Sequence, residues 1–513
     1  MSSIKKLAGQ TMWYGVSSIA ARSLFYLLTP YFTYKLSSTG YGDMSILYAA
    51  IPFLNVIFTY GIETAYFRFA NKEEYEKDIY STATISILSS TLLLTVILLF
   101  SRASIAHLLR LDDHPELITY SALIIAFDTL STLPFAKLRQ DQRPRKYAVV
   151  RIATILFQIA LIYFLLSVCP SLAKENPNGF VATFYKPGYG VGYIIIANVF
   201  SSLFALLLLN KEFFAFQFKF NKTVWIAMMI YSLPLLIAGF GGMINETFDR
   251  IMLTWLAPVT DITAAKEQVA IYSGCYKLSI LITLFIQAFR MGAEPFFFKQ
   301  AEGQNPQKVY ARVMKFFVIT ITIMFLVVAL YLDIWKYFLR RPIYWTGLKV
   351  VPILLLANMF LGIYYNLSIW YKLTHKTIAG AYITLIGAVI TLVINYIFIP
   401  YFSYMACAWA TFFCYGSMMV ISFLWGQKEY RIPYAWKKLS SYIIIVVLLF
   451  FIHEAFIYFF KGNIFNLTSA TILLLLYLWF IINVEWKEFQ RIPFIKKFLP
   501  VSDKVKAETD IEY

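Results

Sequence analysis

Long apolar stretches recur along nearly the whole chain, and short polar segments separate them. Fourteen of them reach at least 18 residues, which is about the length an α-helix needs to cross the ~30 Å hydrocarbon core of a bilayer. They lie near residues 10–34, 43–67, 79–101, 116–136, 147–168, 189–210, 223–257, 269–289, 313–333, 350–371, 378–399, 402–426, 440–460 and 467–485. The pattern predicts an all-α, polytopic membrane protein with about 14 transmembrane helices.

Composition and charge support a membrane protein with a defined topology. The chain has 513 residues, of which 60% are hydrophobic and 14% are charged, and no soluble domain of this size has such a composition. The net charge of +17 follows the spans: if the N-terminus is inside, the inner segments carry 31 Lys and Arg and the outer segments carry 11. This bias predicts that both termini are cytoplasmic, and it explains the basic charge without nucleic acid.

The predicted seventh span, 223–257, carries charges inside an apolar stretch. Pro234 removes a backbone donor and predicts a bend in this helix. Glu246, Asp249 and Arg250 follow at helical spacing, so they share one side of the helix. Charges inside a membrane are costly, so they face a cavity or a partner, or else they sit at the outer interface and pair with each other. A bent, charged helix of this kind is typical of a transporter.

Short patterns at the start of each half of the chain resemble a known family. The first half has Tyr14-Gly15 and, at residues 33–42, the stretch TYKLSSTGYG; the second half has Asp249-Arg250 and, at residues 271–273, IYS. With fourteen spans, the chain resembles the polysaccharide or lipid-linked oligosaccharide flippases (Wzx-like O-antigen or capsule repeat-unit transporters). These belong to the multidrug/oligosaccharidyl-lipid/polysaccharide (MOP) exporter superfamily.

The resemblance implies two six-helix lobes around a central cavity, plus two extra C-terminal helices. The expected division is an N-terminal lobe at 1–215, a C-terminal lobe at 216–430, the last two spans at 431–490 and a cytoplasmic tail at 491–513. It also implies alternating access by a secondary transporter in the bacterial cytoplasmic (inner) membrane. The transporter would flip a polyprenyl-pyrophosphate-linked oligosaccharide to the outer leaflet, for lipopolysaccharide O-antigen, capsule or exopolysaccharide assembly. The expected partners are that lipid, membrane lipids and other polysaccharide-assembly proteins, with no nucleic acid.

Three cations within the spans are the candidates for binding the substrate. Arg22 lies in the middle of the first span, Arg250 in the seventh and Lys277 in the eighth. A guanidinium meets phosphate oxygens with a fork of donors, and this suits a pyrophosphate. For Arg22 the alternatives are an internal salt bridge or snorkelling to the interface.

Four acids within the spans are the candidates for coupling or gating. They are Asp128, Glu63, Glu246 and Asp249. An anionic substrate disfavours bare carboxylates, so these acids either pair with the intramembrane cations, bind sugar hydroxyls, or carry a coupling proton or Na⁺. Apart from such an ion, no cofactor is expected. The four cysteines have no metal-binding spacing, and no metal site is expected.

Two other functions compete with the flippase. A drug or cation exporter of the same superfamily typically has twelve spans, so the two extra helices argue against it. A membrane enzyme of polysaccharide assembly needs a placed base or nucleophile, often on a large outer loop. The predicted outer loops are short, and His107 and His114 on one of them form no catalytic spacing. The sequence therefore predicts a transporter and not an enzyme, with no catalytic residues.

Deep polar aromatics in spans ten and eleven are a separate feature. Tyr364-Tyr365-Asn366, Trp370-Tyr371 and Asn395-Tyr396 lie within otherwise apolar stretches. Such rings either stack on sugars or pack between helices.

Overall fold

The computed structural model describes residues 2–70, 78–301, 303–460 and 462–490, and within these ranges every element is a helix. The predicted tail at 491–513 lies outside the described residues. The chain divides into two compact units. Unit 1 comprises Met1–Tyr310 and Asp333–Pro433, and unit 2 comprises Ala311–Leu332 and Tyr434–Tyr513. The division into lobes at 1–215 and 216–430 stays a prediction.

The predicted spans are found in the structure. Thirteen helices or helix runs in the described part of the chain are long and apolar enough to cross a membrane, and they match the second to fourteenth predicted spans one for one. The first predicted span is covered by α1 (Ser2–Leu27) and α2 (Thr29–Lys35). Helix α1 is long enough to span, but it carries Arg22 and several serines, so it is less apolar than the others. The all-α polytopic fold is confirmed.

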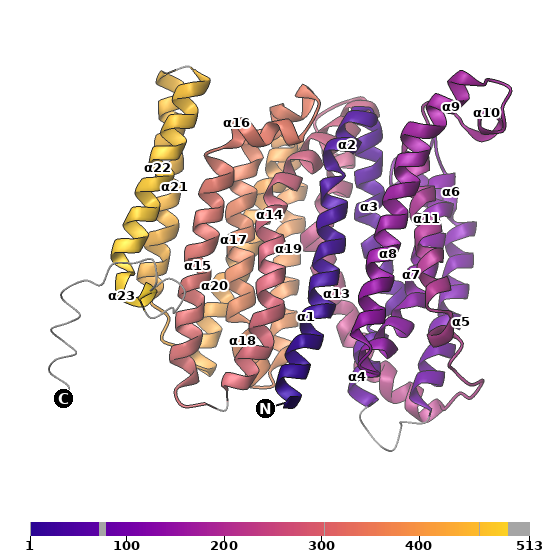
Figure 1. Ribbon diagram of the computed structural model, residues 1–513, viewed down its shortest axis with the longest axis horizontal. Coiled ribbons are helices and arrows are strands. Elements are labelled where there is room, and N and C mark those ends of the chain that lie inside the picture. Colours follow the sequence, from indigo (N-terminus) through magenta and orange to yellow (C-terminus); the bar gives the residue numbers. More distant parts are fainter. Residues whose placement is uncertain (1, 71–77, 302, 461, 491–513) are drawn as a thin grey trace. The chain divides into compact units, whose positions relative to one another are not determined.

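The first half of unit 1 is a bundle around α7. In this bundle α7 packs on α5 and α11, and α8 packs on α1 and α11 (Figure 1). The elements are α3 (Ser38–Thr59), α4 (Ile62–Phe69), α5 (Ile79–Phe100), α6 (Arg102–Leu108), α7 (Glu116–Gln140), α8 (Pro144–Tyr163), the π-helix η1 (Phe164–Val168), α9 (Cys169–Glu175), α10 (Phe180–Phe184), α11 (Gly190–Leu208) and α12 (Asn210–Phe213).

The second half of unit 1 is arranged around α19 and α20. Helix α19 packs between α13 and α20, and α17 packs on α20 and α14. The two halves meet where α3 packs on α13 and α14, and where α1 packs on α14. The elements are α13 (Lys222–Leu256), α14 (Ile262–Gln300), α16 (Leu332–Trp335), the 3₁₀ helices η2 (Lys336–Phe338) and η3 (Pro342–Val350), α17 (Val351–Leu367), α18 (Ile369–Leu373), α19 (Thr377–Phe402) and α20 (Tyr404–Glu429).

Side-chain caps fix where the long helices of the second half begin. The Asn221 side chain accepts hydrogen bonds from the backbone of Thr223 and Val224 at the start of α13. The Asp261 carboxylate accepts one from the backbone of Thr263 at the start of α14. Such caps satisfy backbone donors that the first helical turn leaves free. Helix α13 then runs as one element through Pro234.

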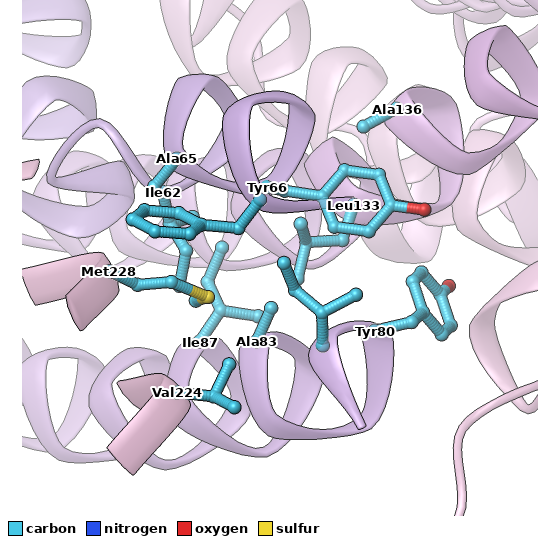
Figure 2. Packing of buried hydrophobic residues seen from close by; sticks show 12 residues of the cluster. Ile62, Ala65, Tyr66, Tyr80, Ala83, Ile87, Leu133, Ala136, Val224 and Met228 are labelled. Carbon is cyan, nitrogen blue, oxygen red and sulfur yellow. The ribbon is translucent and has the colours of Figure 1, made fainter. Parts of the chain in front are cut away.

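A buried apolar cluster ties the start of α13 to the first half of the chain. Figure 2 shows Val224 and Met228 of α13 against side chains of α4, α5 and α7. The cluster consists of Ile62, Ala65, Tyr66, Phe69, Ile79, Tyr80, Ala83, Ile87, Leu133, Ala136, Val224 and Met228. Because these residues come from both halves, this packing holds the halves together at the end of the bundle where α13 begins.

Unit 2 consists of most of α15 (Pro306–Ala329), with α21 (Trp436–Phe459), α22 (Asn463–Val484) and α23 (Trp486–Phe489). Helices α21 and α22 pack together, and many of their Leu, Ile and Phe side chains are exposed, which suits contact with lipid. The Tyr477 hydroxyl on α22 donates to the Thr322 hydroxyl on α15 over 2.7 Å.

The buried carboxylate of Glu485 joins the three long helices of unit 2 at one end. It lies 3.0 Å from the Lys315 ammonium of α15 and 2.7 Å from the Lys438 ammonium of α21, and it accepts a 2.5 Å hydrogen bond from the Tyr442 hydroxyl. Burial by itself raises the pKa of Glu485, but these donors outweigh it and hold the pKa below its ordinary value.

Candidate functional site

A cavity of about 890 Å³ lies inside unit 1. Its lining comes from α1, α3, α8 and α11 of the first half and from α13, α14, α17, α18, α19 and α20 of the second half. The lining runs along α14 from Tyr276 to Arg290 and reaches Lys372 and Thr377 at the turn between α18 and α19. The volume is at the upper end of the range of roughly 300–1,000 Å³ typical of ligand pockets.

Two of the predicted substrate-binding residues, Arg22 and Lys277, line this cavity. Arg22 is on α1 and Lys277 is on α14, and these two helices pack against each other. Neither side chain takes part in an ion pair among the described residues. The structure thus brings together two cations from distant parts of the sequence and leaves both available to an anion.

The third predicted cation, Arg250, lies at a smaller cavity of about 270 Å³. Its guanidinium is 3.1 Å from the Asp249 carboxylate, donates to the Glu246 backbone carbonyl over 2.7 Å, and stacks over the Tyr276 ring at 4.5 Å. The Tyr272 hydroxyl also donates to Asp249 over 2.6 Å. Arg250 is therefore held by its own helix and by α14, and its role in substrate binding stays a prediction.

The four predicted acids lie in different surroundings. Glu246 is exposed and lines both cavities, whereas Asp249 is buried beside Arg250. Glu63 forms an ion pair with Arg139. Asp128 on α7 is not among the lining of either cavity. Only Glu246 thus adds an acid to the larger cavity, and the coupling roles of all four stay predictions.

Sequence reasoning missed two basic residues of the large cavity, Arg290 and Lys372. The Lys372 ammonium lies 2.5 Å from the Glu294 carboxylate, and Arg290 lies 3.4 Å from the same carboxylate. The i,i+4 spacing of Arg290 and Glu294 was the one feature of the sequence that could have indicated this ion pair. Position near a helix end favours snorkelling for Arg290, and the contact with Lys372 of α18 exists only in the folded chain.

Contacts between the halves close the bundle at the end where α2 and α3 meet. The Lys266 ammonium is 2.9 Å from the Asp43 carboxylate, and the Ser38 hydroxyl donates to Glu267 over 2.5 Å. The Arg341 guanidinium donates to the Tyr34 carbonyl over 3.2 Å. A Cβ placed on Gly42 would lie 2.2 Å from the Lys266 carbonyl oxygen, so the backbones of α3 and α14 touch here.

These contacts show what some residues of the short sequence patterns do in the fold. Within the stretch 33–42, the Ser37 hydroxyl accepts from the Gly40 backbone and caps α3. Gly42 allows the close approach to α14, and in the second half Tyr272 binds Asp249. Of the residues that carry the resemblance, Ser37 to Gly42 therefore help to build the closed end, and Asp249, Arg250 and Tyr272 form the buried ion pair and its hydrogen bond.

The match to a family model decides which family the chain belongs to. The model described as polysaccharide biosynthesis protein matches residues 7–301, more than half of the chain. The chain belongs to the polysaccharide biosynthesis protein family. A second model, MatE, matches residues 259–397 of this family member. Comparison with curated protein sequences gives no significant match.

Solved structures show that this polysaccharide biosynthesis protein shares the MOP-superfamily fold. One is a lipid II flippase MurJ in an inward closed conformation, with a TM-score of 0.66 and 13% identity over 92% of this chain and 98% of that chain. Another is an inward-facing multidrug resistance MATE family transporter of the MOP superfamily, with a TM-score of 0.57 and 13% identity over 84% and 95%. A third is the Vibrio cholerae MATE transporter VcmN in the bent form, with a TM-score of 0.53 and 12% identity over 86% and 99%.

The predicted membership of the MOP superfamily is confirmed. The family-model matches and the fold shared with a flippase and with MATE transporters support the prediction of a transporter and not an enzyme, and the apolar helices of the described residues support a multi-pass membrane protein. In the described part of the chain, His, Cys, Asp and Glu side chains form no cluster that could hold a metal ion.

Proposed function

We propose that the protein flips a polyprenyl-pyrophosphate-linked oligosaccharide from the cytoplasmic to the outer leaflet of the bacterial inner membrane. The product would feed assembly of a surface polysaccharide such as lipopolysaccharide O-antigen, capsule or exopolysaccharide. One observation carries the proposal: Arg22 and Lys277 face the same large cavity, and among the described residues neither has an acidic partner. The name of the similar lipid II flippase supports a lipid-linked substrate.

The charge of the cavity explains why an anionic head group would enter it. Among the described residues its lining has four basic residues, Arg22, Lys277, Arg290 and Lys372, and one acid, Glu246. Arg290 and Lys372 contact Glu294, which leaves Arg22 and Lys277 as the cations without an acidic partner in the described part of the chain. Moving a pyrophosphate through lipid unaided is prohibitive, because an ion loses its hydration there. Charge-assisted hydrogen bonds from a guanidinium and an ammonium replace part of that hydration inside the protein.

The side of the membrane that the cavity reaches suggests from which leaflet the substrate would enter. With both termini cytoplasmic, the turn between α18 and α19 lies on the inner side, and the closed end near Asp43 and Lys266 lies on the outer side. The cavity reaches the inner turn at Lys372 and Thr377, so this conformation would receive substrate from the cytoplasmic leaflet. No cofactor is needed in this cycle, and a proton or Na⁺ would couple through one of the four predicted acids.

A drug or cation exporter is the second candidate, since the MatE model matches part of the second half. The excess of basic over acidic residues in the cavity disfavours it, because an organic cation would meet like charge there.

A flipping assay in proteoliposomes tests the proposal. The probe is a fluorescent polyprenyl-pyrophosphate oligosaccharide, and the variants are Arg22→Ala, Lys277→Ala and Arg250→Ala, with Arg102→Ala on exposed α6 as the control. We expect wild type and the control to move the lipid, and Arg22→Ala and Lys277→Ala to lose at least tenfold in rate. Equal rates in all five proteins would make these charges structural. Movement of an organic cation but of no lipid-linked sugar would favour the second candidate.

A further inference from the structure

Tyrosine dominates the aromatic lining of the large cavity. Among the described residues, seven of its eight lining aromatic side chains are Tyr and one is Phe, whereas the whole chain has 37 Tyr and 47 Phe. Five of the seven come from the second half: Tyr276, Tyr364, Tyr365, Tyr371 and Tyr415, here named the tyrosine wall. If the rings served only to fill space, Phe would serve as well, so the hydroxyl groups require an explanation.

Two hydroxyl contacts of the tyrosine wall are long. The Tyr364 and Tyr371 hydroxyls are 3.4 Å apart, and the Tyr415 hydroxyl is 3.4 Å from the Asn245 carbonyl. These distances are well beyond the ~2.7–2.8 Å usual for O–H···O bonds. A ligand hydroxyl that entered the cavity would therefore offer the Tyr364 and Tyr415 hydroxyls a shorter hydrogen bond.

Two rings of the wall have a cation stacked on one face. The Arg250 guanidinium lies 4.5 Å from the Tyr276 ring centre, and the Arg290 guanidinium lies 4.7 Å from that of Tyr365. Both tyrosines also border the open space of the cavity. The stacking fixes the rings in place, and a fixed ring loses less side-chain entropy when a ligand packs on it.

A buried amide in the same wall lacks a partner on one of its atoms. Asn358 on α17 lines the cavity, is 1% exposed, and donates from its amide nitrogen to the Ser279 hydroxyl over 3.2 Å. Its amide oxygen has no hydrogen-bond partner within the part of the chain that the structure describes. An unpaired buried acceptor is costly, and it marks a place where a ligand donor would bind.

Together these features fit a neutral polyol. A sugar presents hydroxyls that both donate and accept, along with apolar C–H faces, and tyrosine offers a matching ring and hydroxyl. An organic cation would fit aromatic rings too, but in the described part of the chain the cavity lining has more basic side chains than acidic ones. A plain lipid tail would use the rings and leave the hydroxyls and the Asn358 oxygen unpaired.

We propose that the tyrosine wall is the sugar-recognition subsite, which reads the oligosaccharide while Arg22 and Lys277 hold the pyrophosphate. The inference rests on the proposed function and adds to it the residues that decide which glycan is carried. Tyr364, Tyr371 and Asn358 select the sugar, and Tyr276 and Tyr365 provide the packing surface.

Binding to the purified full chain in detergent separates the two parts of the site. The probes are a short-chain prenyl pyrophosphate, and the same lipid carrying in turn glucose, galactose, N-acetylglucosamine or a disaccharide of each. The variants are Tyr364→Phe and Tyr371→Phe, singly and together, because Phe keeps the ring and removes only the hydroxyl. The matched control is Tyr382→Phe on α19, whose side chain is 56% exposed and outside the cavity lining.

We expect at least one sugar-bearing lipid to bind wild type more tightly than the sugarless lipid. Each Phe variant should lower that advantage by about 3- to 10-fold, the value of one hydrogen bond, and leave the affinity for the sugarless lipid unchanged. Arg22→Ala should lower the affinity for the sugar-bearing and the sugarless lipid by the same factor, and Tyr382→Phe should change neither affinity.

Several results would overturn the subsite. One is that no sugar in the panel improves binding over the sugarless lipid. Another is that the Phe variants retain the full gain in affinity from the sugar. The third is that the Phe variants lower the affinity for the sugar-bearing and the sugarless lipid equally. Failure of the proposed function looks different, since wild type would then bind the sugarless pyrophosphate no better than the corresponding prenyl alcohol.

Discussion

Gly42 is the residue whose replacement should most directly change the conformational balance of this transporter. It lies on α3 where the two halves touch, and a Cβ there would be 2.2 Å from the Lys266 carbonyl oxygen and 2.9 Å from the carbonyl carbon. Both atoms are backbone, so no side-chain rotation relieves the contact. In Gly42→Ala the two helices must separate at the closed end.

The size of the effect follows from this geometry. Moving the Cβ from 2.2 Å to an ordinary contact of 3.4 Å requires a separation of about 1.2 Å. The Asp43–Lys266 ion pair and the Ser38–Glu267 hydrogen bond span the same interface and would lengthen too. Overpacking of this kind costs about 1–3 kcal/mol. That corresponds to a shift of roughly 5- to 150-fold toward conformations that are open at this end. The helix propensity of Ala opposes the effect by at most ~1 kcal/mol.

Thiol labelling from outside the cell measures the shift. Ile280 lines both cavities, so Ile280→Cys reports when a membrane-impermeant maleimide can reach the interior. The four native cysteines are fully buried, and the protein without Ile280→Cys gives the background. We expect Gly42→Ala to raise the labelling rate of Ile280→Cys at least fivefold.

Gly292→Ala is the matched control, because Gly292 lies on α14 and a Cβ there would meet nothing within 4 Å. It has the same helix-propensity gain without the clash. Equal labelling rates in the Gly42→Ala and Gly292→Ala proteins would refute the argument that backbone contact at Gly42 holds this end closed.

Two further predictions concern buried carboxylates outside the spans. Glu485→Gln should destabilise unit 2 by about 1–3 kcal/mol, because Lys315 and Lys438 lose a buried charged acceptor. Since the pKa of Glu485 is held below its ordinary value, its stabilisation is present above ~pH 4.3 and is lost as pH falls through the folded pKa. The gap in Tm between wild type and Glu485→Gln should therefore be widest near pH 7 and close in acid; a constant gap would contradict this. Glu212→Gln should lower Tm as well, since the 2% exposed Glu212 side chain lies 2.7 Å from Arg143 and 2.6 Å from Lys146. Glu175→Gln on exposed α9 is its control, and an equal Tm for the two variants would refute a structural role for Glu212.

The spans themselves were readable from the sequence, because in a bilayer a helix must satisfy its own backbone and expose apolar side chains to lipid. Each predicted span from the second to the fourteenth has its helix in the structure. The first span differs from the others in its hydropathy. Arg22 and its serine neighbours make α1 less apolar where it borders the cavity.

The intramembrane charges were also visible in the sequence, but the sequence did not show which of them line the cavity and which are paired with other residues. Arg22, Lys277 and Arg250 look alike as cations within apolar stretches. Only the packing of α1 on α14 turns Arg22 and Lys277 to one cavity, while Asp249 and the Glu246 carbonyl engage Arg250. A hydropathy pattern shows that a charged residue lies within an apolar stretch. It does not show which neighbouring residue pairs with that charge.

The sequence alone therefore determined that this protein lies in lipid, the order of its long apolar helices, and the few positions that break the apolar pattern. What only the tertiary structure decided is which of those positions meet. The tyrosine wall gathers residues of α14, α17, α18 and α20 that lie up to 139 positions apart, from Tyr276 to Tyr415. At the closed end, Gly42 of α3 fits against the Lys266 carbonyl of α14 beside the Asp43–Lys266 ion pair. Such contacts arise from the packing of whole helices, and in a membrane one apolar helix face resembles another, so the choice of neighbours is made by shape and by a few polar groups.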